Sequence, residues 1–154
     1  MTSAEESLFE LGTDGPSQIL VGVDGSTTSL RAGAYAAGLA RRQGARVTMV
    51  FVVPVTSLAA ASGGVQFAAA ERESLEEVAA DLRAQAEERS RELGISVTFV
   101  TAHGDPFAEL ARIADETRAD AVVVGASAKA GHRLIGSLAV RLVRAGRWPV
   151  TVVP

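Results

Sequence analysis

The residues best suited to bind a ligand follow two apolar runs in the chain. Asp24 comes directly after Ile19–Val23, and Gly125 comes directly after Ala121–Val124. Gly136 and Ser137 then open a helical stretch. The start of a helix offers unpaired backbone N–H groups and a partial positive charge, which suits a phosphate. The pattern therefore favours a nucleotide site over a metal site or a proteolytic site.

The elements that must position these residues alternate along the chain. Five apolar runs predict strands, and each connection between consecutive strands carries a helical pattern. The predicted strands are 19–23, 47–53, 95–100, 121–124 and 150–153, and the predicted helices run from Ser26 or Thr27 to about Gly44, from Glu71 to Leu93, from Asp105-Pro106 onward, and from Ser137 to Arg144. This alternation is typical of an α/β three-layer sandwich with a parallel sheet.

In such sheets ligands bind at the carboxyl ends of the strands, where the strand order reverses. Asp24 and Gly125 both fall at strand ends of this kind. The segment 55–70 is rich in Ala, Ser and Gly and is expected to be either a lid or a disordered connector. His103 and His132 are expected to be solvated loop residues, because neither has a partner at metal-ligand spacing.

Length and composition narrow the class of protein. The 154 residues predict a flexible N-terminal extension over 1–17 and a single domain over 18–154. The net charge of −3 argues against nucleic-acid binding, and the absence of cysteine excludes disulfides and thiolate chemistry. No apolar stretch is long enough to span a membrane, and the first residues lack a signal-peptide pattern, so a cytoplasmic protein is expected.

The order and spacing of these segments resemble the universal stress protein family over Gln18 to Pro154. The residues that carry the resemblance are Ile19-Leu-Val-Gly-Val-Asp-Gly-Ser, Val47-Thr-Met-Val-Phe-Val-Val, Gly104-Asp-Pro, Ala119-Asp-Ala-Val-Val-Val-Gly, Gly136-Ser and Trp148-Pro-Val-Thr-Val-Val. The resemblance implies the strand order 3-2-1-4-5 and a homodimer that pairs through the C-terminal strand 149–153. For one branch of the family it also implies bound ATP or another adenine nucleotide, with or without Mg²⁺.

The resemblance assigns roles to individual residues. It implies that Asp24 meets the ribose, that Val52 lies beside the adenine and that Gly125 lets the backbone approach the nucleotide. Gly136 and Ser137 would hold phosphates. The remaining members of the predicted site are Val124, Ala128, Lys129, Arg133 and Leu138.

The loop between Gly125 and Gly136 departs from the family pattern. Ala128 stands where the nucleotide-binding branch has a second glycine, and the loop is two residues shorter than in that branch. Lys129 and Arg133 could replace lost amide contacts by positive charge. Because of this departure, the alternative that the protein binds no cofactor also stays open.

Three functions are compatible with these residues. The first is an adenine-nucleotide module that senses stress or energy state. The second is a nucleotide-free dimer that acts through contacts with a regulatory protein of unknown identity. The third is ATP hydrolysis, weak at most, because the sequence offers no positioned general base and no second carboxylate beside Asp24. Asp24 could equally serve as a turn residue, and Ser137 as an ordinary helix N-cap.

Overall fold

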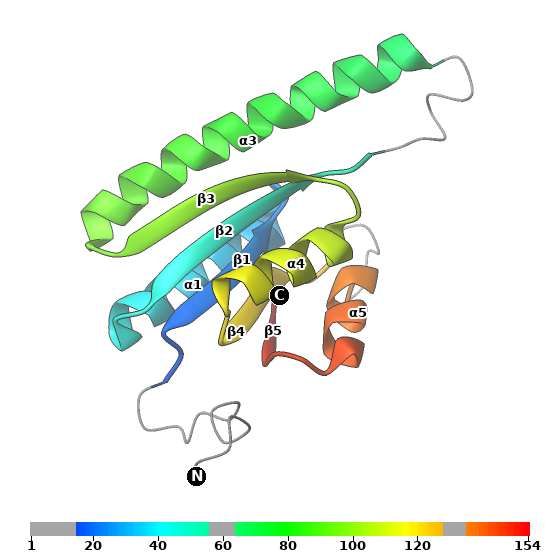
Figure 1. Ribbon diagram of the computed structural model, residues 1–154. Coiled ribbons are helices and arrows are strands. Elements are labelled where there is room, and N and C mark those ends of the chain that lie inside the picture. Colours follow the sequence, from blue (N-terminus) through cyan, green and yellow to red (C-terminus); the bar gives the residue numbers. More distant parts are fainter. Residues whose placement is uncertain (1–14, 56–63, 128–134) are drawn as a thin grey trace.

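The computed structural model of the chain describes residues 15–55, 64–127 and 135–154 (Figure 1). Five parallel strands form one sheet in the order β3-β2-β1-β4-β5, as the resemblance implied. The strands are β1 (Gln18–Val23), β2 (Arg46–Val53), β3 (Ser96–His103), β4 (Ala121–Gly125) and β5 (Val150–Val153). The helices are α1 (Thr27–Gln43), α3 (Val65–Leu93), α4 (Pro106–Thr117) and α5 (Ser137–Ala145).

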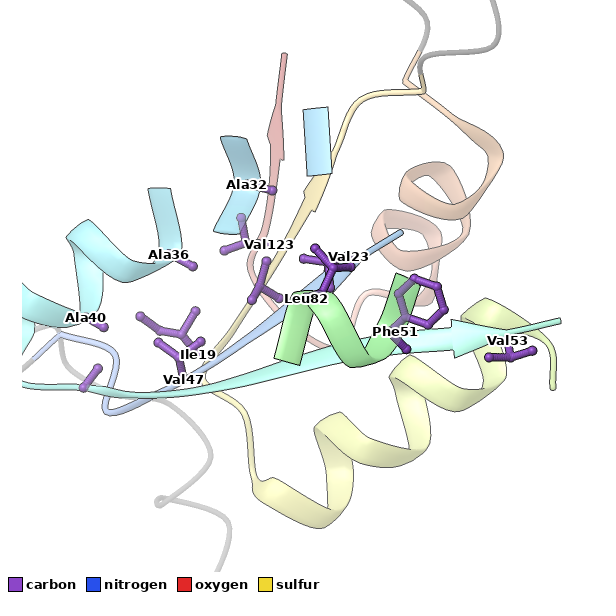
Figure 2. Packing of buried hydrophobic residues seen from close by; sticks show 13 residues of the cluster. Ile19, Val23, Ala32, Ala36, Ala40, Val47, Phe51, Val53, Leu82 and Val123 are labelled. Atoms are coloured by element: carbon purple, nitrogen blue, oxygen red, sulfur yellow. The ribbon is translucent and has the colours of Figure 1, made fainter. Parts of the chain in front are cut away.

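Alternating strand residues build a separate apolar layer on each face of the sheet. On one face α1 and α3 cover a layer that includes Ile19, Val21 and Phe51 (Figure 2). On the other face α4 and α5 cover a layer that includes Leu20 and Val122. The strands β1, β2 and β4 therefore read as near-continuous apolar runs, and the predicted three-layer α/β sandwich is confirmed.

Helix ends follow the predicted caps in most places. The Ser26 hydroxyl accepts a hydrogen bond from the Ser29 N–H at the start of α1, and Gly44 ends that helix in the left-handed conformation. Asp105 caps α4 in the same way, with Pro106 in the first turn. These caps place the beginnings of α1 and α4 at the same edge of the sheet, where the strands end.

The predicted start of the helix at Glu71 is wrong. The helix α3 begins at Val65, and Val65 and Phe67 are largely exposed. This first stretch has no apolar stripe facing the sheet, so a periodic pattern could not reveal it, although the alanines 68–70 favour helix intrinsically. The expectation of a lid or a disordered connector is therefore wrong for residues 65–70, which are the first part of α3. Residues 56–63 of the same predicted segment lie outside the described residues.

The chain enters the sheet through a cluster of hydrogen bonds at Asp120. Its Oδ2 accepts from the Ser17 N–H at 2.9 Å, the Ser17 hydroxyl at 2.8 Å and the Gln18 N–H at 2.9 Å. The predicted flexibility of 1–17 stays a prediction, because 1–14 lie outside the described residues. Among the helices that the structure describes, none has the length and apolar content needed to cross a bilayer.

Candidate functional site

A cleft of about 440 Å³ opens at the carboxyl ends of β1 and β4. The strand order reverses between these two strands, so the cleft lies where ligands bind in doubly wound sheets. Most of the predicted site residues line it, namely Asp24, Val52, Val124, Gly125, Gly136, Ser137 and Leu138. The other three, Ala128, Lys129 and Arg133, lie outside the described residues.

The inner part of the cleft is apolar. Val50 and Val52 of β2 and Val124 of β4 belong to the sheet face that α4 and α5 cover, and all three line the cleft. Gly22 of β1 adds depth there, since a Cβ at this position would lie 3.2 Å from Leu110 Cδ1. This wall can accept a flat apolar group such as a purine base.

Asp24 supplies the only charge among the described residues that line the cleft. One of its oxygens, Oδ1, accepts a hydrogen bond from the Ser26 N–H at 2.9 Å, so Asp24 is indeed a turn residue. Burial raises the pKa of Asp24, but hydrogen bonds from Ser26 and Ser29 lower that pKa by more. The carboxylate is therefore ionised at neutral pH, and its two oxygens have further lone pairs with which to accept hydrogen bonds from a ligand.

Gly125 is required by the approach of α1, whatever binds in the cleft. A Cβ on Gly125 would lie 2.5 Å from the Thr28 carbonyl carbon and 2.6 Å from the Ser29 nitrogen. The Thr28 hydroxyl also donates a 2.6 Å hydrogen bond to the Ala126 carbonyl oxygen. The start of α1 is thus fastened to the end of β4, directly beside the cleft.

Thr28 is a member of the site that the sequence did not reveal. It lies in a Ser/Thr-rich stretch, 26–29, that was interpreted only as a helix cap. Its bond to Ala126 joins residues 98 positions apart, so no local pattern could signal it.

At the start of α5 the N-cap residue is Gly136, so the alternative of Ser137 as an ordinary N-cap is wrong. No side chain caps this helix, in contrast to α1 and α4. A Cβ on Gly136 would lie 2.8 Å from Ser127 Cβ, which brings the Ser127 and Ser137 residues to one side of the cleft. The first N–H groups of α5 and these two serines can therefore donate to an anion.

A second polar cluster lies at the end of β3, beside the first part of α3. Nε2 of His103 is 2.5 Å from Oε1 of Glu76. His103 is exposed, as expected, but it is the last residue of β3 and not a loop residue, because β3 runs three residues past Val100. His132 lies outside the described residues. In the described part of the chain, no three acidic or histidine side chains gather in a way that could hold a metal ion.

These features define a doubly wound parallel α/β domain with a cleft at its topological switch point. The profile of the universal stress protein family matches residues 16–154. The chain belongs to the universal stress protein family.

Individual relatives agree with this assignment. Universal stress protein MJ0531 of Methanocaldococcus jannaschii is 28% identical over 151 residues, which is 96% of this chain and 87% of that protein. A universal stress family structure from Burkholderia pseudomallei is 30% identical, with a TM-score of 0.64 over 90% of this chain and 96% of that one. A universal stress protein solved in complex with cAMP is 26% identical, with a TM-score of 0.65 and the same two coverages.

Proposed function

We propose that the cleft binds an adenine nucleotide and that its occupancy reports stress or energy state. The observation that carries the proposal is the convergence of an apolar wall, an ionised carboxylate and an uncapped helix start in one 440 Å³ cleft. A cleft of this size holds a small ligand of nucleotide dimensions. The relative in complex with cAMP supports an adenine nucleotide as the ligand.

Each part of the nucleotide has a matching part of the cleft in this proposal. The base lies against Val52 and Val124, which offer apolar surface on neighbouring strands of the same sheet face. The Asp24 carboxylate accepts hydrogen bonds from the ribose hydroxyls. The phosphate receives hydrogen bonds from Ser137, Ser127 and the first N–H groups of α5.

The charge of the cleft bears on which nucleotide binds best. Among the described lining residues, Asp24 is negative and none is positive. A triphosphate there needs added positive charge, which Mg²⁺ or the predicted contributions of Lys129 and Arg133 would supply. A nucleotide with a single phosphate needs less, so we expect AMP or cAMP to depend less on Mg²⁺ than ATP does.

Calorimetric titration of nucleotide-stripped protein with ATP, AMP and adenosine, each with and without Mg²⁺, tests the proposal. Asp24→Asn should weaken nucleotide binding by about 10-fold or more, because hydrogen bonds to a charged group contribute about 1.5–3 kcal/mol. Asp105→Asn is the matched control, since Asp105 stands at another strand-to-helix turn outside the cleft and Asn keeps its cap. If none of the ligands binds at millimolar concentration, at two temperatures, the proposal fails.

A second candidate function is a nucleotide-free dimer that acts through protein contacts. The observation that favours it is β5, an edge strand whose residues are all only partly buried. The carbonyls of Pro149 and Val153 accept hydrogen bonds from Val122 in β4 and from Ala126 just after it, so the N–H of Val152 faces the open edge. Antiparallel pairing of 149–153 with a second copy would use this edge.

The dimer is tested by sedimentation at several concentrations. Val152→Pro removes an outward N–H and should shift the protein toward the monomer while the far-ultraviolet circular dichroism is kept. A wild-type protein that sediments as a monomer at tens of micromolar would reject this candidate.

A further inference from the structure

A second cleft of about 410 Å³ lies on the opposite face of the sheet from α4 and α5, between α1 and α3. It exists because α1 presents small residues, Gly33, Ala34 and Ala37, on this side, so the two helices do not close over β2. We call it the α1–α3 groove. Its lining residues are Val23, Leu30, Gly33, Ala34, Ala37, Val47, Met49, Leu82, Gln85, Ala86, Arg89, Leu93, Ile95 and Val97.

The α1–α3 groove is mostly apolar and partly open to water. Leu30 on its rim is 46% exposed, although leucine is usually buried in a domain of this size. Met49 and Val97 on its floor are only partly buried. Arg89 is the one charged side chain among the described residues that line it. A surface of this kind favours an apolar occupant that carries negative charge at its edge.

We propose that the segment 1–14 of the same chain occupies the α1–α3 groove, with Leu8, Phe9 and Leu11 as its apolar anchors. This segment lies outside the described residues, so the proposal is made from its sequence and from the point at which the described chain begins. The three anchors fall within four positions, and either helical or extended spacing brings two of them to one side. This proposal is independent of nucleotide binding.

The point of entry brings the segment to the correct end of the groove. Gly15 lies against the side chain of Gln43, the last residue of α1. In Figure 1 the described chain enters β1 at the end of the sheet where α1 and α3 both finish. The segment therefore starts beside one mouth of the groove.

The reach of the segment matches the length of the groove. Leu11 and Leu8 precede Gly15 by four and seven residues, which allows a span of at most about 14 and 25 Å. Ala37 and Leu30 precede Gln43 by six and thirteen residues, which is about 9 and 20 Å along the helix. The anchors can thus reach the middle and the far part of the groove.

Charge is complementary as well. The segment 1–14 contains four acidic residues, Glu5, Glu6, Glu10 and Asp14, and no basic residue. The helix α1 contains no acidic residue, and two of its arginines, Arg41 and Arg42, lie in its last turn, beside the point where the segment begins. Arg89 faces α1 across the groove and already pairs with Glu92 at 3.0 Å. An acidic segment with an apolar centre therefore suits this surface better than a basic or purely apolar one.

A spin label on the segment tests the proposal directly. Because the chain contains no cysteine, Ser7→Cys creates a single labelling site next to the first anchor. In ¹⁵N-edited spectra of the full chain, the amide signals of Ala34 and Ala86 should lose most of their intensity. The signal of Leu110, on the opposite face, should keep its intensity.

Two variants identify the contact. Replacing Leu8, Phe9 and Leu11 together by Ser should restore the Ala34 and Ala86 signals of the labelled protein. Ala34→Glu puts a negative charge on the groove and should do the same, whereas Tyr35→Glu, at the next position of α1 but outside the groove, should not.

Three results would overturn the proposal. The first is that the Ala34, Ala86 and Leu110 signals keep equal intensities, and the second is that the signal loss survives the triple Ser replacement. The third comes from a mixed sample, in which ¹⁵N-protein carries no spin label and the spin-labelled protein carries no ¹⁵N. Signal loss at Ala34 and Ala86 in that sample would mean that the label lies on another molecule. The last result would assign the groove to the segment of a second copy.

Discussion

Gly125→Ala should destabilise the protein even when no ligand is present. The new Cβ would lie 2.5 Å from the Thr28 carbonyl carbon, 2.6 Å from the Ser29 nitrogen and 2.7 Å from the Thr28 carbonyl oxygen. All three are backbone atoms at the start of α1, so a side-chain rotation cannot remove the overlap. The first turn of α1 or the end of β4 must move.

The magnitude follows from the contacts that such a movement disturbs. Overpacking a closed site costs about 1–3 kcal/mol, and loss of the Thr28–Ala126 hydrogen bond adds about 1 kcal/mol. The lower backbone entropy of alanine in the unfolded chain offsets about 0.4–1 kcal/mol. We expect a net loss of about 2 kcal/mol, or a fall of roughly 4–8 °C in Tm.

Urea unfolding followed by circular dichroism measures this change, with Gly38→Ala as the control. Gly38 lies inside α1, and the nearest atom to its added Cβ is Arg42 Nη1 at 3.6 Å. Alanine should stabilise the protein there by about 0.5–1 kcal/mol, so the two substitutions should act in opposite directions. A free energy of unfolding for Gly125→Ala within about 0.5 kcal/mol of wild type would refute this interpretation of Gly125.

Three further changes test other contacts of the fold. Asp120→Ala removes the acceptor of three hydrogen bonds and should cost about 1–3 kcal/mol in urea unfolding. Burial raises the pKa of Asp120, but its hydrogen bonds lower that pKa by more than burial raises it. The contribution of Asp120 to the free energy of unfolding is therefore complete at a pH above its ordinary pKa of 3.8. That contribution should disappear as the pH falls through the lower folded pKa, and the wild-type and Asp120→Ala stabilities should converge in acid. Thr28→Val should cost about 1 kcal/mol and weaken any nucleotide binding, because the Ala126 carbonyl loses its donor beside the cleft; unchanged stability would contradict the assigned bond. Gln18→Leu should cost about 1–3 kcal/mol because it leaves the buried Thr48 hydroxyl without its 2.8 Å partner. The double variant with Thr48→Val should lose less stability than the sum of the two single losses, and strict additivity would argue against the hydrogen bond between these residues.

The strands and most helix ends could be predicted because their signals are local. Apolar runs mark the buried strands, and Ser26, Gly44 and Asp105 mark helix ends through hydrogen bonds within a few residues. The start of α3 could not be predicted this way. Its first residues make no apolar stripe, and they are helical without being buried.

The cleft was partly predictable for a geometric reason. Parallel strands bring their carboxyl ends to one edge, so Asp24 and Gly125 had to lie near each other once the strand order was known. Thr28 and the His103–Glu76 pair could not be found, because each joins elements that are distant in sequence. The sequence shows such side chains but not their partners.

The structure also changes which residues can report on ligand binding. Gly125 meets the backbone of α1, and Gly136 meets Ser127, so both glycines have packing reasons that hold in an empty protein. Their presence is therefore weak support for a nucleotide, and their substitution would confuse lost folding with lost binding. Asp24 and Ser137 are better probes, because each can be changed to a residue of similar size, Asn or Ala, at a partly open position. A loss of nucleotide affinity in these two variants at unchanged stability would separate the nucleotide-binding proposal from the nucleotide-free alternative.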